Sequence, residues 1–229
     1  MNLKKAKDPF RFMTQMSLTQ PTGVKVRDLH ELLNQLNAVP GSVIYYHTHH
    51  FLKQHQYLSP EPPNDFAYWV THVLREERLG ERLASIDTVR FSSLRAIREK
   101  LISVIQEYLA GTRTTRTVSD GDELYLMKSI SFVFPTSYQA RDLEEFLQAV
   151  RKISVLSLYH HIFEARLRLE KGVNDFSTWL EGELGEKQLA QWIVGLDPYT
   201  QTLEALRARI VRLIEQRLRS LSQEGARAS

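Results

Sequence analysis

The stretch PTGVKVRDLHELL, residues 21–33, recurs as PTSYQARDLEEFL, residues 135–147, and this repetition decides how the rest of the sequence is interpreted. Further identities continue in the same register: Met13 with Met127, Ser17 with Ser131, Tyr45 with Tyr159 and His47 with His161. After a shorter second loop, Asn64, Asp65, Phe66 and Trp69 fall on Asn174, Asp175, Phe176 and Trp179. Chance similarity would not keep its register through successive elements and break only between them. The sequence therefore predicts an internal duplication.

Each copy is expected to fold as about four helices. Leucines at helical spacing predict a first helix over Lys25–Leu36, with Thr22 as its N-cap and Thr136 in the same role in the second copy. The segments that precede the first helices, 10–13 and 124–134, are compatible with either a short strand or a helix. We predict an all-α fold of two tandem four-helix units related by a pseudo-twofold axis.

The domain boundaries follow from this repeat. The first repeat copy is expected over residues 1–110 and the second repeat copy over 124–221, followed by a frayed tail over 222–229. Residues 111–123 contain no periodic apolar residue, so they are predicted to be a polar linker.

Composition limits the class of protein. Of the 229 residues, 42% are hydrophobic and 25% charged, which is typical of a globular chain. The absence of cysteine excludes disulfides, thiolate metal ligands and cysteine nucleophiles. No apolar run reaches the roughly 18 residues that a membrane span needs, so we expect a cytoplasmic protein without membrane contact. A net charge of +3 is too small to indicate nucleic acid, and a protein or small ligand is the expected partner.

The repeated histidines lie on the apolar stripes of their predicted helices and have two interpretations. Each is either a buried structural histidine that hydrogen-bonds a carboxylate or carbonyl group, or a metal ligand. In the second interpretation, His50 and Glu164 follow three residues later on the same helical faces, and two aspartates add oxygen ligands. The candidate metal ligands are therefore His47, His50, Asp65, His161, Glu164 and Asp175. Such a set suits Fe, Mn or Zn, provided that the two copies bring their ligands together.

The Asn-Asp-Phe-x-x-Trp motif has a structural explanation. The Asn or Asp caps a helix, while the Phe and Trp, three residues apart, enter the core. The alternative is that the carboxylate acts as a ligand or general base beside the histidine of the same copy. His49 has no histidine or carboxylate counterpart in the second copy and is expected at the surface.

Together these motifs carry a family resemblance. The pattern Ser-x-x-Tyr-His, present as SVIYYH at 42–47 and SLYHH at 157–161, followed by Asn-Asp-Phe-x-x-Trp, resembles an uncharacterised prokaryotic domain-of-unknown-function family. The resemblance covers nearly the whole chain and implies a helical fold, but it brings no activity or cofactor. We therefore predict a binding or interaction module, with a metal-dependent helical-bundle enzyme as the alternative. The sequence decides neither for nor against catalysis.

Overall fold

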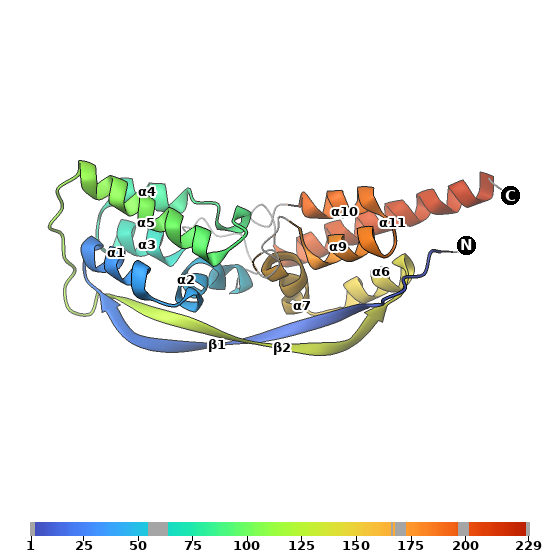
Figure 1. The fold of residues 1–229 in the computed structure, drawn as a ribbon, viewed down its shortest axis with the longest axis horizontal. Helices are drawn as coiled ribbons and strands as arrows, with labels where there is room; N and C mark the ends of the chain where they lie inside the picture. Colours follow the sequence, from blue (N-terminus) through green and yellow to red (C-terminus); the bar gives the residue numbers. More distant parts are fainter. Residues whose placement is uncertain (1–2, 55–63, 166, 168–172, 197–201, 228–229) are drawn as a thin grey trace. The chain divides into compact units, whose positions relative to one another are not determined.

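The computed structural model describes residues 3–54, 64–165, 167, 173–196 and 202–227, with side chains except at 50–54, 89 and 225–227. Two long strands, β1 (Phe10–Val26) and β2 (Leu124–Ala140), pair as a two-stranded antiparallel sheet (Figure 1). The expectation of an all-α fold is therefore wrong. Both segments alternate apolar residues with a period of two, as in Phe10 and Phe12, and this period is typical of strands.

Hydrogen bonds between side chains and the facing strand establish the sheet register. Ser17 Oγ lies 3.2 Å from Ser131 Oγ, and Thr22 Oγ1 donates to the carbonyl of Leu126 at 2.6 Å. In the same way, Thr136 Oγ1 donates to the carbonyl of Phe12 at 2.7 Å. These bonds place residue 17 opposite 131, residue 22 opposite 126 and residue 12 opposite 136.

The two threonines therefore bond to the sheet and are not helix caps as predicted. The N-caps are Asp28 and Asp142, whose carboxylates accept backbone N–H groups of α1 (Leu29–Ala38) and α6 (Leu143–Lys152). Residues 25 and 26, expected in the first helix, are the last residues of β1.

An ion pair lies where β2 begins. Lys25 Nζ donates to Glu123 Oε1 at 2.6 Å, and the Gly121 N–H donates to Glu123 Oε2 at 2.7 Å. The lysine, together with backbone N–H groups, lowers the pKa of Glu123 to about 2.

The described contacts divide the chain into two compact units. Among the described residues, the first comprises residues 3–16 together with those within 132–227, and the second residues 17–54 and 64–131. Each unit therefore contains part of β1 and part of β2, and its described helices come from one half of the sequence.

In the second unit, the helices follow α1 directly. They are α2 (Gly41–Gln54), α3 (Asp65–His72), α4 (Glu77–Ala84), the 3-10 turn η1 (Thr88–Arg90) and α5 (Leu94–Gly111). Within the described residues this unit thus has five α-helices, in place of the expected four. The core side of α5 is formed by Ile97, Leu101 and Ile105, all fully buried, and α5 contacts α1, α2 and α4.

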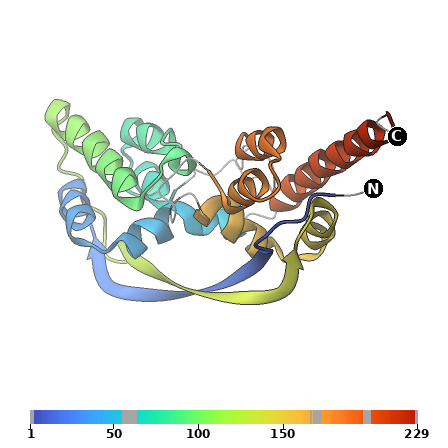
Figure 2. The same ribbon diagram turned by 45° about the vertical axis from the view of Figure 1, so that its right-hand side comes forward.

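In the first unit, α6 is followed by further helices, coloured from brown to red in Figure 2. They are α7 (Val155–Tyr159), the π-helical turn η2 (His160–Glu164), α9 (Asp175–Gly182), α10 (Lys187–Val194) and α11 (Leu203–Arg227). Leu206, Ile210 and Ile214 of α11 are buried. None of the helices described here is long and apolar enough to cross a membrane.

A tight turn separates the helices α3 and α4, and another separates α9 and α10. Gly185 has a φ of +73°, a conformation that glycine adopts without strain. At the matching place in the second unit, Arg75 has a φ of +63°, which is uncommon for a residue with a side chain. The close approach of α4 to α3 also requires Gly80, because a Cβ there would lie 1.8 Å from Thr71 Oγ1.

Candidate functional site

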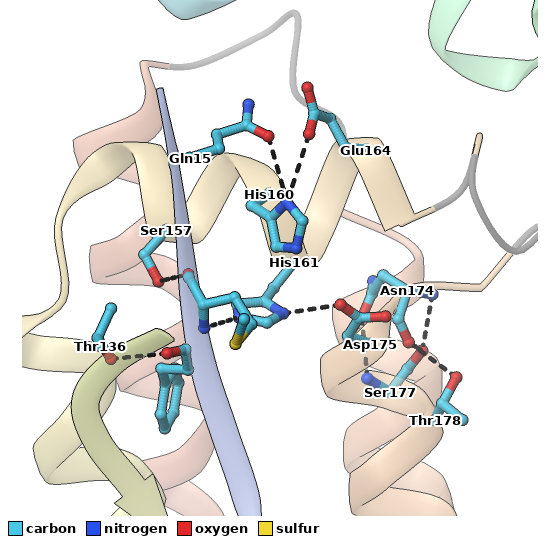
Figure 3. Close-up of polar contacts among 12 residues, drawn as sticks. Gln15, Thr136, Ser157, His160, His161, Glu164, Asn174, Asp175, Ser177 and Thr178 are labelled. Atoms are coloured by element: carbon cyan, nitrogen blue, oxygen red, sulfur yellow. Dashed lines mark hydrogen bonds and ion pairs between the residues drawn. The ribbon is translucent and has the colours of Figure 1, made fainter. Parts of the chain in front are cut away.

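The repeated histidine of the first unit, His161, connects a helix to a strand. Its ring is 3% exposed and lies in η2 (Figure 3). The Met13 N–H of β1 donates to His161 Nε2 at 2.8 Å, and His161 Nδ1 lies 2.7 Å from Asp175 Oδ2. The ring therefore joins the strand backbone to the first residue of α9.

The second unit repeats this geometry with its own residues. His47, in α2, is also 3% exposed. Its Nε2 accepts the Met127 N–H of β2 at 3.0 Å, and its Nδ1 lies 2.8 Å from Asp65 Oδ2 at the start of α3. Both units therefore contain a strand–histidine–aspartate connection, which we call the histidine bridge.

The strand amide determines the protonation of each bridge. A backbone N–H can only donate, so Nε2 of His47 and of His161 must present its lone pair. The single proton of the neutral ring is then on Nδ1, where it is donated to the aspartate. This assignment rests on the hydrogen-bond partners. Both nitrogens of each ring are consequently engaged, one as acceptor and one as donor.

The carboxylates of the bridges lie at helix N-termini, where negative charge is favoured. Asp65 and Asp175 are the first residues of α3 and α9, and the N-caps are the preceding Asn64 and Asn174. The Asp65 side chain is 48% exposed, whereas that of Asp175 is 17% exposed. The bridge of the first unit is therefore the better shielded from water.

The aromatic residues of the same motif enter the core. Trp69 and Trp179 are 4% and 9% exposed. Their indole N–H groups donate to the backbone carbonyls of Asp122 at 3.0 Å and Asp8 at 2.9 Å. Each tryptophan therefore holds the chain segment that leads into a strand.

Not all the predicted metal ligands come together. The structure brings His47 to Asp65 and His161 to Asp175, while Glu164 Oε2 lies 3.3 Å from Nδ1 of a different histidine, His160. The side chain of His50 lies outside the described part of the structure. Convergence of ligands from the two copies remains a prediction.

Sequence reasoning missed His160, which has a tyrosine in the first copy, and Gln15 on β1. His160 is 3% exposed, and its Nδ1 lies 3.2 Å from Gln15 Oε1. Gln15 Nε2 is buried and has no hydrogen-bond partner among the described residues. Potential ligand atoms of His160, His161 and Asp175 lie within 4.8 Å of one another. The doubled histidine at 160–161 was the signal that could have indicated this cluster.

The surface position expected for His49 is wrong. Its side chain is 2% exposed and stacks on Tyr45, with ring centroids 5.4 Å apart. Nδ1 of His49 lies 2.7 Å from Thr48 Oγ1. It is buried because α2 is covered on several sides, as the burial of Ile44, Tyr45 and Thr48 on the same helix shows.

The histidine bridges restrict what this cluster can do chemically. A metal ion on His161 would need the Nε2 lone pair that the Met13 amide uses, or the Nδ1 position that carries the proton. Either mode breaks a buried hydrogen bond. His160 differs, because its described hydrogen bonds all use Nδ1, to Gln15 and Glu164. A histidine that binds metal through one ring nitrogen usually donates the N–H of its other ring nitrogen to a carboxylate or a similar acceptor.

Comparison with known proteins gives one family and one structure. The model of a family of unknown function, DUF5752, matches residues 7–215. The structure of OrfY from Thermoproteus tenax is similar, with a TM-score of 0.80 and 29% sequence identity, over 93% of this chain and 96% of that one. No curated protein matches the sequence.

Proposed function

We propose that this chain, which belongs to DUF5752, a family of unknown function, is a non-catalytic module that binds a partner protein through apolar side chains of β1 and β2. We also propose that it works in the cytoplasm. The family membership agrees with the resemblance inferred from the sequence motifs.

The observation that carries this proposal is a concentration of exposed large apolar residues on the sheet. Those at even-numbered positions are Met16 (54% exposed), Leu18 (51%), Ile130 (37%), Phe132 (45%) and Phe134 (44%). The register places Met16 opposite Phe132 and Leu18 opposite Ile130, so the members of each pair share a face of the sheet. We call Met16, Phe132 and Phe134, which all belong to the first unit, the apolar sheet face. Contiguous exposed apolar side chains mark interaction sites more often than isolated ones do.

Charge favours an uncharged apolar partner surface. Residues 14–20 of β1 contain no charged residue, and Lys128 is the one charge within 128–134 of β2. An acidic, basic or nucleic-acid partner would have little to recognise here. The apolar sheet face therefore suits a partner protein with an apolar patch of its own.

The histidine bridges support this role by holding the strands. Each bridge uses an N–H of the outer strand edge, and Ser157 Oγ also donates to the Met13 carbonyl at 2.6 Å. An edge whose groups are engaged in this way is a poor template for adding another strand. Binding is therefore expected on the face of the sheet and not on its edge.

The test uses a photo-crosslinking residue in place of Phe132, with the same residue at exposed Gln148 of α6 as the control. Crosslinks specific to position 132 would identify the partner in the source cells. The purified protein should then bind the purified partner at least about tenfold more weakly when Met16 and Phe132 are both replaced by serine. The Gln148→Ala variant should bind the partner like the wild type. Equal crosslinking at both positions, or a serine variant that binds normally, would contradict the proposal.

A metal-dependent enzyme is the second candidate, because His160, His161 and Asp175 come within 4.8 Å. The cofactor would be Fe, Mn or Zn, and His160 would be its best-supported ligand. Metal analysis of protein purified without a polyhistidine tag tests this idea. A stoichiometric metal, with a chelator-induced drop in Tm that His160→Ala abolishes, would favour the enzyme. We expect no chelator effect, because His161 has no free ring nitrogen.

A further inference from the structure

A cavity of about 400 Å³ lies between α10 and the C-terminal part of α11 in the first unit. Trp192 on α10 lines it and is 46% exposed, unlike the two buried tryptophans. α11 has 25 residues against 18 in α5, and its C-terminal end extends past α10 (Figures 1 and 2). The added turns supply Glu224 to one wall of the cavity, which Ser220 of the preceding turn also lines.

The second unit has an ion pair at the position that corresponds to the cavity. In the register of the repeat, Trp192 corresponds to Arg82 of α4, and Gln216 of α11 corresponds to Glu107 of α5. Arg82 Nη2 donates to Glu107 Oε2 at 2.5 Å, so an ion pair joins the two helices there. The first unit has an aromatic ring and an amide in its place. The aromatic ring and the amide that line the cavity are therefore specific to the first unit.

The charges around the cavity cancel. Arg217 Nε donates to Glu186 Oε2 at 2.7 Å, and its Nη1 donates to Glu224 Oε1 at 3.4 Å. The hydrogen bond to Glu186 is the main reason that the pKa of Arg217 is raised. Lys187 adds a second cation to the lining, which then holds two positive and two negative groups. A phosphate or other anion therefore finds no excess positive charge.

The remaining lining groups are neutral and polar. Gln188 and Gln216 present amides that both donate and accept hydrogen bonds, and Ser220 presents a hydroxyl group. An indole face beside such groups suits a ring with an apolar face and polar edges. The volume is within the range of about 300–1,000 Å³ that small-molecule sites occupy.

We propose that this cavity binds a small neutral ring compound that stacks on Trp192 and hydrogen-bonds to Gln188 and Gln216. Nucleosides and saccharides share this chemistry: a ring that stacks, hydroxyl or amide groups at its edge, and no net charge. The site is independent of the apolar sheet face, because it lies on other elements of the first unit.

Tryptophan fluorescence provides the first measurement. Trp69 and Trp179 are buried with bonded indole N–H groups, so a ligand on Trp192 should change the solvent-exposed part of the emission. Adenosine and maltose are titrated separately into the full chain. Saturation by either, with a Kd below about 1 mM, supports the proposal and identifies the class. Failure of both to saturate would overturn it.

Matched variants then test the location by calorimetry. The double variant Trp192→Arg with Gln216→Glu copies the ion pair of the second unit, and it should bind at least tenfold more weakly. Gln188→Ala keeps the indole and should also weaken binding, while Gln148→Ala on α6 should not. A double variant that retains its urea midpoint and binds as tightly as wild type would place the ligand elsewhere and refute the assignment.

Discussion

Replacing His161 with alanine should accelerate hydrogen exchange of the Met13 backbone amide and leave the exchange of the Met127 amide unchanged. In the wild type, the Met13 N–H is bonded to His161 and the Met127 N–H to His47. The substitution leaves the Met13 N–H without an acceptor, which costs about 1–3 kcal/mol. Since about 1.4 kcal/mol corresponds to a factor of ten, the Met13 amide should exchange roughly 10- to 100-fold faster.

The loss of global stability should be larger than this local effect. The imidazole is 3% exposed, so its removal also leaves a void and deletes the hydrogen bond between His161 Nδ1 and Asp175. Together these losses should lower the free energy of unfolding by about 2–5 kcal/mol. His161→Gln should lose less, because its side-chain oxygen can accept the Met13 N–H in place of Nε2.

Hydrogen exchange followed by NMR measures each amide separately, and urea denaturation measures the global change. His47→Ala is the matched control, in which Met127 and not Met13 should lose protection. Comparing the two amides within one variant removes the effect of global destabilisation. If both amides accelerate equally in His161→Ala, or if Met13 keeps its protection, the bridge does not hold the strand and the reasoning fails.

Three further predictions follow from the backbone and from charge. Arg75→Gly should raise the free energy of unfolding by about 0.5–1 kcal/mol by removing left-handed strain, while Gly185→Ala at the matching turn should lower it by a similar amount; the same sign for both urea midpoints would contradict this. Gly80→Ala should cost about 1–3 kcal/mol because its Cβ would overlap Thr71, and a melting temperature equal to wild type would show that α3 and α4 separate freely. Because the pKa of Glu123 is lowered in the folded state, its carboxylate stabilises the fold above the unfolded pKa of 4.5, and this stabilisation is lost as the pH falls toward about 2. Glu123→Gln should therefore lose less stability than wild type over that interval. Urea midpoints of the two proteins that run parallel from pH 5 to pH 2 would disprove the effect.

Several elements of the fold were predictable because their signals are local. The leucines of α1 recur at helical spacing, and Asn64 and Asn174 precede apolar runs, so helix positions and the buried tryptophans followed from the sequence. The sheet was missed for a physical reason. Thr22 and Thr136 were predicted to cap helices, but each follows a proline within a strand, and a two-stranded sheet has only edge strands, which tolerate proline. The alternation around Phe10 and Leu124 was the better signal.

The site was predictable only in part. The repeated His47 and His161 were located, and their aspartate partners were named, because both pairs recur in the two copies. The strand amides that fix the rings lie 80 and 148 residues away in sequence, and no local pattern reports such a contact. His160 was overlooked because it breaks the repeat. Sequence identities between the two halves indicate only the residues that both halves share. A residue found in one half only, such as His160, is identified from the structure.

The division of each strand between the two compact units has a consequence for how the chain acquires its structure. Residues 10–16 leave the ribosome before the rest of their compact unit, which is completed by helices that end near residue 227. A nascent chain must therefore keep an unpaired, apolar strand segment exposed through most of its synthesis. Such distant pairing slows folding and lengthens exposure to aggregation. Expression that depends on chaperone supply, and loss of soluble product when the chain is cut within residues 111–123, are the expected results.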